Sequence, residues 1–306
     1  MQADGFDLIS AVLAIPGLGN KALRRLLPPG GGLSPALDVG ALDLAIQAMA
    51  ANNTRIKYAG KDTLLEGVAG ASALRGRHAD AGIECITWFS STYPSSFMAL
   101  ADAPPILYIR GDVGLLKGQP AVAIIGTREP TDFVARSLYR MAGRCADRSI
   151  AVVSGLALGC DAAAHAGSVA RGGNTIAVLP GGVGTVYPPQ HQDLAESIVR
   201  AGGLLVSEYP EGTPVKEYTF VARDRLQAAL AAGVICGQAG IEGGAMHACR
   251  HAVQMGKPIA VLAPMAGGDF TGNSALIEAD QAVILSDQEG LERFLADIMQ
   301  PYGQEK

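Results

Sequence analysis

The chain has 306 residues, of which 49% are hydrophobic and 17% charged, and its formal net charge is −5. This composition excludes intrinsic disorder, and the length is enough for about two domains. Because the chain is not basic overall, any nucleic-acid site must be built from a few placed residues. Its 39 glycines, about twice the usual share, indicate turns and close approaches of the backbone to a ligand.

Apolar stretches such as Ser149–Leu158 are interrupted well before they reach the length of a membrane span. The chain begins without a basic segment, and its five cysteines form no CxxC pair. We therefore expect a cytoplasmic protein with reduced thiols, no signal peptide, no membrane contact and no metal site.

The first part of the chain predicts a small helical domain, residues 1–85. Residues 6–29 are typical of a helix, a Pro16-Gly17-Leu18-Gly19 turn and a second helix capped by Asn20. A Pro/Gly-rich break at 28–32 follows, and then weaker helical patterns over 34–50 and 61–80.

Residues 86–290 alternate short β-branched runs with helical patterns. The expected strands are 122–126, 150–154, 175–179, 203–207, 234–236 and 258–262, and the expected helices are 131–145, 161–170, 190–201, 224–232 and 243–255. This alternation predicts an α/β fold with a doubly wound, mainly parallel Rossmann-like sheet, whose ligands lie at the carboxyl ends of the strands. A short C-terminal helix and tail, residues 291–306, are expected to follow.

The loops after the first two strands carry polar side chains. Gly126-Thr127-Arg128, with Pro130 at an expected helix start, predicts an anion site, although an ordinary βα turn has the same pattern. Ser154-Gly155 precedes Asp161 and His165, which could cap a helix and pair. A catalytic Ser/His/Asp set is the alternative, and a capped helix packed on the sheet is favoured.

Two further loops are rich in glycine. Residues 180–185 could form a phosphate-binding nest or simple tight turns. Gly243 and Gly244 open a helix, where small residues would let a ligand reach the helix N-terminus. His247 and His251 follow on that helix without a third ligand, so zinc is not expected.

The segment after the fourth strand combines cations with an aromatic ring. Lys216, Arg223 and Arg225 surround Phe220 within ten residues. This set suits a phosphodiester backbone with one base stacked on the ring. A solvated loop with Phe220 as a buried anchor fits the composition equally well.

Arginine also recurs every four residues on the first helix of the sheet domain, at 136, 140, 144 and 148. Such a row could follow DNA phosphates. It is also typical of the solvated face of an amphipathic helix, which here would bury Val134, Leu138, Met141 and Cys145.

Taken in order, these motifs resemble the DNA-processing protein A family (DprA/Smf). The resemblance rests on Tyr93-Pro94, the 102–111 segment, Gly126-Thr127-Arg128, Ser154-Gly155-Leu156-Ala157 with Asp161 and His165, residues 175–188, Ser207-Glu208-Tyr209, Phe220 with Arg223 and Arg225, and Gly272-Asn273 with Leu276-Ile277.

The resemblance implies a non-catalytic, cofactor-free protein that binds single-stranded DNA, forms a homodimer and loads the RecA recombinase during natural transformation. It implies that the helical domain is SAM-like. Its expected DNA contacts are Gly126, Thr127, Arg128, Ser154, Gly155, Lys216, Phe220, Arg223, Arg225, Gly243 and Gly244.

Several positions depart from the family pattern. Asp224 replaces the asparagine of an R-N-R triplet, Gln238 replaces an acidic residue and Gly184 an aspartate; residues 242–248 differ from the usual loop; and no winged helix is expected after residue 290. A carboxylate between two arginines would weaken phosphate binding unless it caps the helix.

The rival hypothesis is a nucleotide-binding sensor or nucleotide-processing enzyme on a related scaffold. Residues 180–185 superficially resemble the PGGxGT loop of the cytokinin-activating, lysine-decarboxylase-like family. That family has a catalytic glutamate three positions after the threonine, where this chain has Pro188.

Overall fold

The computed structural model describes residues 4–28 and 39–300. The chain divides into two compact units, Met1–Tyr108 and Ile109–Lys306. The first unit therefore runs past the expected domain boundary at residue 85, and the domain division stays a prediction. Most of the predicted break at 28–32, the start of the 34–50 pattern and the tail from 301 lie outside the described residues.

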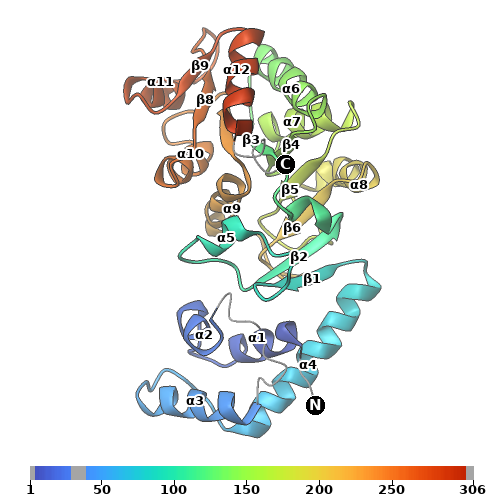
Figure 1. Ribbon diagram of the computed structural model, residues 1–306, viewed down its shortest axis with the longest axis vertical. Helices are drawn as coiled ribbons and strands as arrows, with labels where there is room; N and C mark the ends of the chain where they lie inside the picture. Colours follow the sequence, from blue (N-terminus) through green and yellow to red (C-terminus); the bar gives the residue numbers. More distant parts are fainter. Residues whose placement is uncertain (1–3, 29–38, 301–306) are drawn as a thin grey trace. The chain divides into compact units, whose positions relative to one another are not determined.

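The first unit is mainly helical (Figure 1). Phe6, Leu8, Ile9 and Val12 of the first helix are buried, as the apolar stripe predicts. The N-cap of the second helix is Gly19, so the prediction of Asn20 as the cap is wrong. Asn20 is the first residue of that helix. The elements are α1 Gly5–Leu13, α2 Asn20–Leu26, α3 Val39–Ala51, α4 Lys61–Asp80, β1 Glu84–Thr87, α5 Ser95–Met98 and, at the boundary, β2 Ile106–Gly111.

The second unit is a parallel sheet covered by helices on both faces. Its strands are β3 Ala121–Ile125, β4 Ala151–Ser154, β5 Thr175–Val178, β6 Leu204–Ser207, β7 Gly233–Cys236, β8 Ile259–Leu262 and β9 Val283–Leu285. They run in the order β6-β5-β4-β3-β7-β8-β9, and all of these neighbouring pairs are parallel. This confirms the predicted doubly wound α/β fold. Sequence analysis missed β9, which has only three residues.

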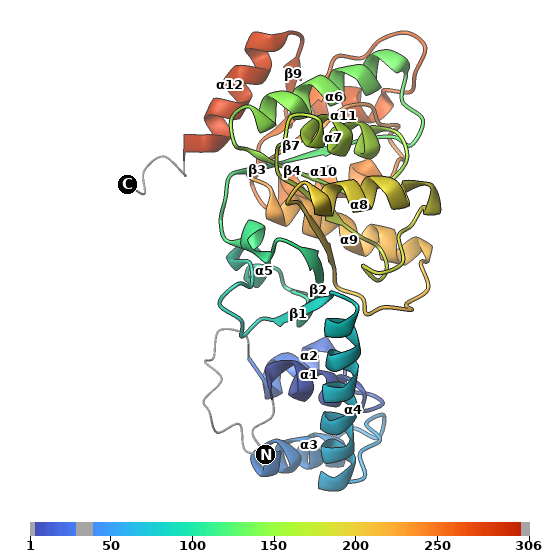
Figure 2. The ribbon, with the colours of Figure 1, turned by 90° about the vertical axis from the view of Figure 1, so that its right-hand side faces the viewer.

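The helices of this unit are α6 Asp132–Ala146, α7 Cys160–Val169, α8 Gln192–Arg200, α9 Glu217–Leu230, α10 Ala245–Gln254, α11 Thr271–Glu278 and α12 Gln288–Met299, with 3₁₀ turns η1 Val113–Leu116 and η2 Pro189–His191. Figure 2 shows α6, α7 and α8 along one side of the sheet and α9 and α10 along the other. Because these amphipathic helices bury apolar side chains against β-branched strands on both sides, the strands β3 to β8 are mainly apolar and fully buried.

The strand order places a topological switch point between β3 and β7. The chain adds β4, β5 and β6 on one side of β3 and then crosses to add β7, β8 and β9 on the other side. The loops that leave β3 and β7 therefore separate over opposite faces of the sheet, and such a crevice is where open α/β sheets bind ligands.

Two helix starts differ from the sequence predictions. Thr131 caps α6, its Oγ1 accepting from the Val134 N–H at 3.3 Å, so Pro130 precedes the cap instead of opening the helix. Helix α9 begins at Glu217, seven residues before the expected start. The cation-rich segment is therefore largely a helix rather than a loop.

Among the described residues, no helix is long and apolar enough to cross a membrane. The same part of the chain holds no cluster of His, Cys, Asp or Glu side chains able to bind a metal ion.

Candidate nucleic-acid interface

A cavity of about 310 Å³ opens at the switch point. It is lined by the loops after β3, β4 and β7, the start of α7 and one face of α9. Phe220, Arg223, Asp224 and Gln227 all line it, and their spacing of three, four and seven residues puts them on one helical face. Because α9 begins early, these polar and aromatic side chains lie on one face of a helix and form one side of the cavity.

Arg128, in the loop after β3, and Phe220, on α9, lie next to each other in the cavity lining. The Arg128 guanidinium carbon lies 5.0 Å from the centre of the Phe220 ring, a cation–π distance. Tyr187, 43% exposed, meets the same ring edge-on, with 5.5 Å between the centres. The exposed Arg128 and the half-buried Phe220 offer a phosphate partner and a stacking surface next to each other.

Arg223 lies deeper and is held by polar neighbours. Its Nε is 3.3 Å from Asp224 Oδ1, and its Nη1 is 3.9 Å from Asp161 Oδ2. With the Gln227 amide oxygen turned toward it, that oxygen accepts from Arg223 Nη1 at 2.5 Å and from the Gly155 N–H at 2.7 Å. Since the side chain is 5% exposed, Arg223 mainly organises the floor of the cavity.

Acidic groups outnumber basic ones in the cavity lining. Arg128 and Arg223 face three carboxyl groups, those of Glu129, Asp161 and Asp224. Burial raises the pKa of Asp224 to about 7, against the opposing attraction of Arg223. Burial likewise raises the pKa of Asp161, against Arg223 and two backbone N–H donors. A proton on Asp224 therefore removes one negative charge from the cavity lining.

The β3 and β7 loops are joined by Gln238. Its backbone carbonyl accepts from the Thr127 N–H at 2.7 Å, and its side-chain Oε1 accepts from the Thr131 N–H at 3.0 Å. A Cβ on Gly126 would lie 2.4 Å from Cys160 Sγ and 3.0 Å from the Gln238 carbonyl. Gln238, which replaces the acidic residue of the family pattern, thus links the two loops through hydrogen bonds. The sequence did not predict this role.

The structure brings most of the expected DNA contacts together. Gly126, Thr127, Arg128, Phe220, Arg223, Gly243 and Gly244 all line the cavity. Their roles in DNA binding stay predictions.

Four expected contacts lie outside the cavity lining. The buried Ser154 hydroxyl donates to the Ile124 carbonyl at 2.6 Å. Arg225 forms a two-pronged ion pair with Glu208, with N–O distances of 2.7 and 2.8 Å. Lys216 is exposed at the N-cap of α9. Gly155 is buried behind the cavity, where its N–H donates to Asp161 Oδ2 at 3.1 Å.

The Ser/His/Asp alternative is wrong. His165 Nδ1 contacts Thr175 Oγ1 at 2.7 Å, while Asp161 accepts from the Gly155 and Ala157 N–H groups. The expected pairing of Asp161 with His165 is therefore also wrong. Asp161 does not cap α7 either, because the N-cap of that helix is Gly159. Burial lowers the pKa of His165 to about 3, so the ring stays neutral.

The glycine-rich loop after β5 does not leave an open phosphate nest. The Gly184 N–H donates to Glu211 Oε2 at 2.7 Å, and the Thr185 hydroxyl donates to Glu211 Oε1 at 2.5 Å. The chain's own carboxylate therefore takes the place that a phosphate would need.

Residues 84–295 match the DNA recombination-mediator protein A family. This chain belongs to that family. Protein Smf of Synechocystis is 34% identical over 70% of this chain and 54% of its own length, and Protein Smf of Escherichia coli is 31% identical over 66% and 54%. The chain thus spans about half the length of these two relatives. DNA processing protein DprA of Streptococcus pneumoniae is 32% identical over 66% of this chain and 71% of the relative.

Solved structures agree with this assignment. DNA processing protein A from Streptococcus pneumoniae covers 96% of this chain and 98% of its own, with a TM-score of 0.75 and 22% identity, which shows the shared fold. Its counterpart from Helicobacter pylori covers 72% of this chain and 96% of its own, with a TM-score of 0.62 and 30% identity. The family assignment confirms the resemblance found in the motifs.

Proposed function

We propose that this chain binds single-stranded DNA in the switch-point cavity and acts as a recombination mediator. The observation that carries the proposal is the adjacency of Arg128 and Phe220 at the mouth of that cavity, with a 5.0 Å separation of cation and ring. The Helicobacter pylori relative, whose structure is described for its single-stranded DNA binding mode, supports it.

The chemistry favours one or two nucleotides inside the cavity. A phosphate would pair with the exposed Arg128 guanidinium, and a base would stack on Phe220 or on the guanidinium plane. Gly243 and Gly244 carry no side chains, so the sugar-phosphate backbone can approach the start of α10. None of these steps breaks a covalent bond, and the proposed role is non-catalytic.

The test is an anisotropy titration of labelled oligo-dT at two salt concentrations. We expect salt-sensitive binding, with affinity lost in Arg128→Ala and Phe220→Ala, and a salt dependence reduced by about one phosphate contact in Arg128→Ala. Arg293→Ala is the matched control, because Arg293 is an exposed arginine on α12 paired with Glu289. Wild-type affinity in both cavity variants would refute the proposed site.

Competition separates this function from the rival one. Duplex DNA and mononucleotides should displace the oligonucleotide weakly. Displacement by a mononucleotide at low concentration would instead favour a nucleotide sensor, since a cavity of this volume encloses one nucleotide more readily than a strand.

We further propose that the chain acts in the cytoplasm as a homodimer that loads RecA during DNA uptake. The edge strand β9 supports self-association, because Val283 and Ile284 are 56% and 44% exposed there. Light scattering of the wild type and of Val283→Glu tests the dimer. RecA strand exchange on strands coated with single-stranded DNA-binding protein tests loading, with Arg128→Ala expected to abolish the stimulation.

A further inference from the structure

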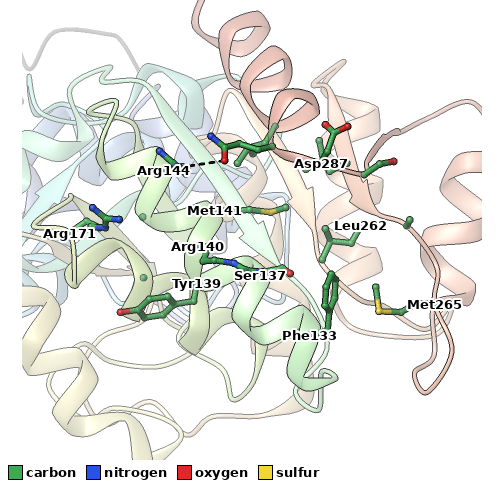
Figure 3. A pocket seen from close by; sticks show the side chains of 17 residues that line it. Phe133, Ser137, Tyr139, Arg140, Met141, Arg144, Arg171, Leu262, Met265 and Asp287 are labelled. Carbon is green, nitrogen blue, oxygen red and sulfur yellow. Dashed lines mark hydrogen bonds between the residues drawn. The ribbon is translucent and has the colours of Figure 1, made fainter.

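A second cavity, of about 560 Å³, lies on the α6 side of the sheet. Helix α6, the end of α7 and the segments after β8 and β9 line it, as Figure 3 shows in close-up. It shares no lining residue with the cavity assigned to DNA. Arg140 and Arg144, from the arginine row of α6, line this cavity. The proposed function assigns no role to them.

The base of this groove is apolar. The buried leucines at its base are the last residues of β8 and β9 and one residue of α12, and two half-buried methionine side chains also line the groove. Phe133, at the start of α6, is 50% exposed at the rim. Methionine adapts to ligands of different shape, so this surface suits an inserted apolar side chain.

Guanidinium groups surround the apolar base. Arg140 makes no hydrogen bond or ion pair with any described residue, and Arg144 contacts only the Gln288 amide oxygen, at 3.4 Å. Arg171 is 3.8 Å from Asp147. The one lining carboxylate, Asp287, accepts from the Gly290 N–H as the cap of α12. The groove is therefore positive, although the whole chain has a net charge of −5.

The residue types of the lining distinguish a protein partner from a nucleic acid. Aromatic residues, methionine and arginine are enriched at the centres of protein interfaces, and lysine and glutamate are depleted. The described lining contains the first three types and neither lysine nor glutamate, and it also includes Ala263, Asp287 and two serines, which are of depleted types. A DNA strand would instead need ring faces beneath its nucleobases, and the floor of this groove consists of leucine and methionine side chains, with Phe133 at the rim.

We propose that this groove docks an acidic peptide segment of a partner protein that also carries one bulky apolar side chain. That side chain packs against the leucines and methionines beside Phe133. Flanking carboxylates pair with Arg140 and Arg144, whose charges no described carboxylate neutralises. Since the groove and the DNA cavity share no residue, one molecule can hold both ligands together.

The experiment uses the full chain and a fluorescein-labelled peptide in which glutamates flank a single tryptophan. We expect binding that weakens with salt, and that weakens about tenfold or more in Arg140→Gln/Arg144→Gln. Phe133→Ser, which changes an exposed side chain, should weaken it as well. Glutamine-for-glutamate and alanine-for-tryptophan peptides should each bind poorly, because each lacks half of the recognition.

Arg293→Gln is the matched control and should bind like the wild type, since Arg293 is exposed on α12 outside the groove. Oligo-dT affinity should stay unchanged in the groove variants. Equal peptide binding by wild type and both groove variants would overturn the proposal. Displacement of the peptide by oligo-dT or by inorganic phosphate would also overturn it and assign the groove to a simple anion.

Discussion

The guanidinium of Arg223 occupies the space in which a side chain on Gly155 would begin. A Cβ on Gly155 would lie 1.2 Å from Arg223 Nη1 and 2.2 Å from Arg223 Cζ. Strand β4 and helix α9 can therefore approach each other only because residue 155 is glycine. The floor of the switch-point cavity depends on this contact.

We expect Gly155→Ala to destabilise the chain by about 3 kcal/mol, because the new methyl group must displace a buried, paired guanidinium. Thermal melting and oligo-dT affinity should both fall. Gly70→Ala is the control, since nothing lies within 4 Å of a Cβ there and alanine favours the α4 helix. A variant at 155 that melts and binds like the wild type would contradict the packing described here.

We expect Asp224 to make the proposed DNA binding dependent on pH. Because its folded-state pKa is raised to about 7, the carboxyl is mostly neutral at lower pH and becomes negative as pH rises through about 7. Oligo-dT affinity should then fall, by about tenfold between roughly pH 6 and 8 if only the neutral form accepts a phosphate. Asp224→Asn should bind with an affinity that no longer changes over this range.

The same residue affects stability. Since the pKa of Asp224 is higher in the folded than in the unfolded chain, its contribution to stability is full below the unfolded pKa of about 4 and is lost as pH rises toward about 7. Asp224→Asn should therefore gain in melting temperature over the wild type as pH increases. A constant difference between the two proteins across pH 4 to 8 would show that Asp224 does not titrate in this range.

Arg225 should affect folding rather than DNA contact. Its guanidinium is paired at both ends with Glu208, and both side chains are nearly buried. We expect Arg225→Ala to cost about 3 to 5 kcal/mol, because it leaves the Glu208 carboxylate buried without its partner. A double-mutant cycle with Glu208→Gln measures this coupling in denaturant unfolding. Arg225→Ala with full stability but lost DNA affinity would instead support the original expectation of a direct contact.

The sequence was sufficient to predict the strands β3 to β8, because these strands are buried on both faces. Runs such as Val122–Ile125 are continuously apolar, and each ends at a glycine or polar loop, so both the strands and the site's edge of the sheet were predictable. The start of α9 was not predictable from the sequence. Its first turns carry Lys216, Tyr218 and Phe220 with no apolar stripe, because the helix faces a polar cavity rather than the core.

The partners of the charged residues were also beyond the sequence. Nothing in the spacing of Arg225 and Glu208, seventeen residues apart, indicates that they pair. Gln238 similarly joins two loops that are 107 residues apart at its contact with Thr131. Such pairs depend on which strands become neighbours in the sheet. Local sequence patterns do not predict that strand order.

The loop after β5 gives a last prediction. A Cβ on Gly182 would lie 2.7 Å from the Glu211 Cα and 2.5 Å from its Oε2, so Gly182→Val should push the loop away from Glu211. Because Glu211 also accepts from Gly184 and Thr185, we expect this variant to lose both hydrogen bonds and to have a free energy of unfolding lower by about 2 kcal/mol. Amide hydrogen exchange should show faster exchange at residues 181–185. Glu211→Ala should give the same local opening without the steric clash. If Gly182→Val exchanged and melted like the wild type, the carboxylate would not be what orders this loop.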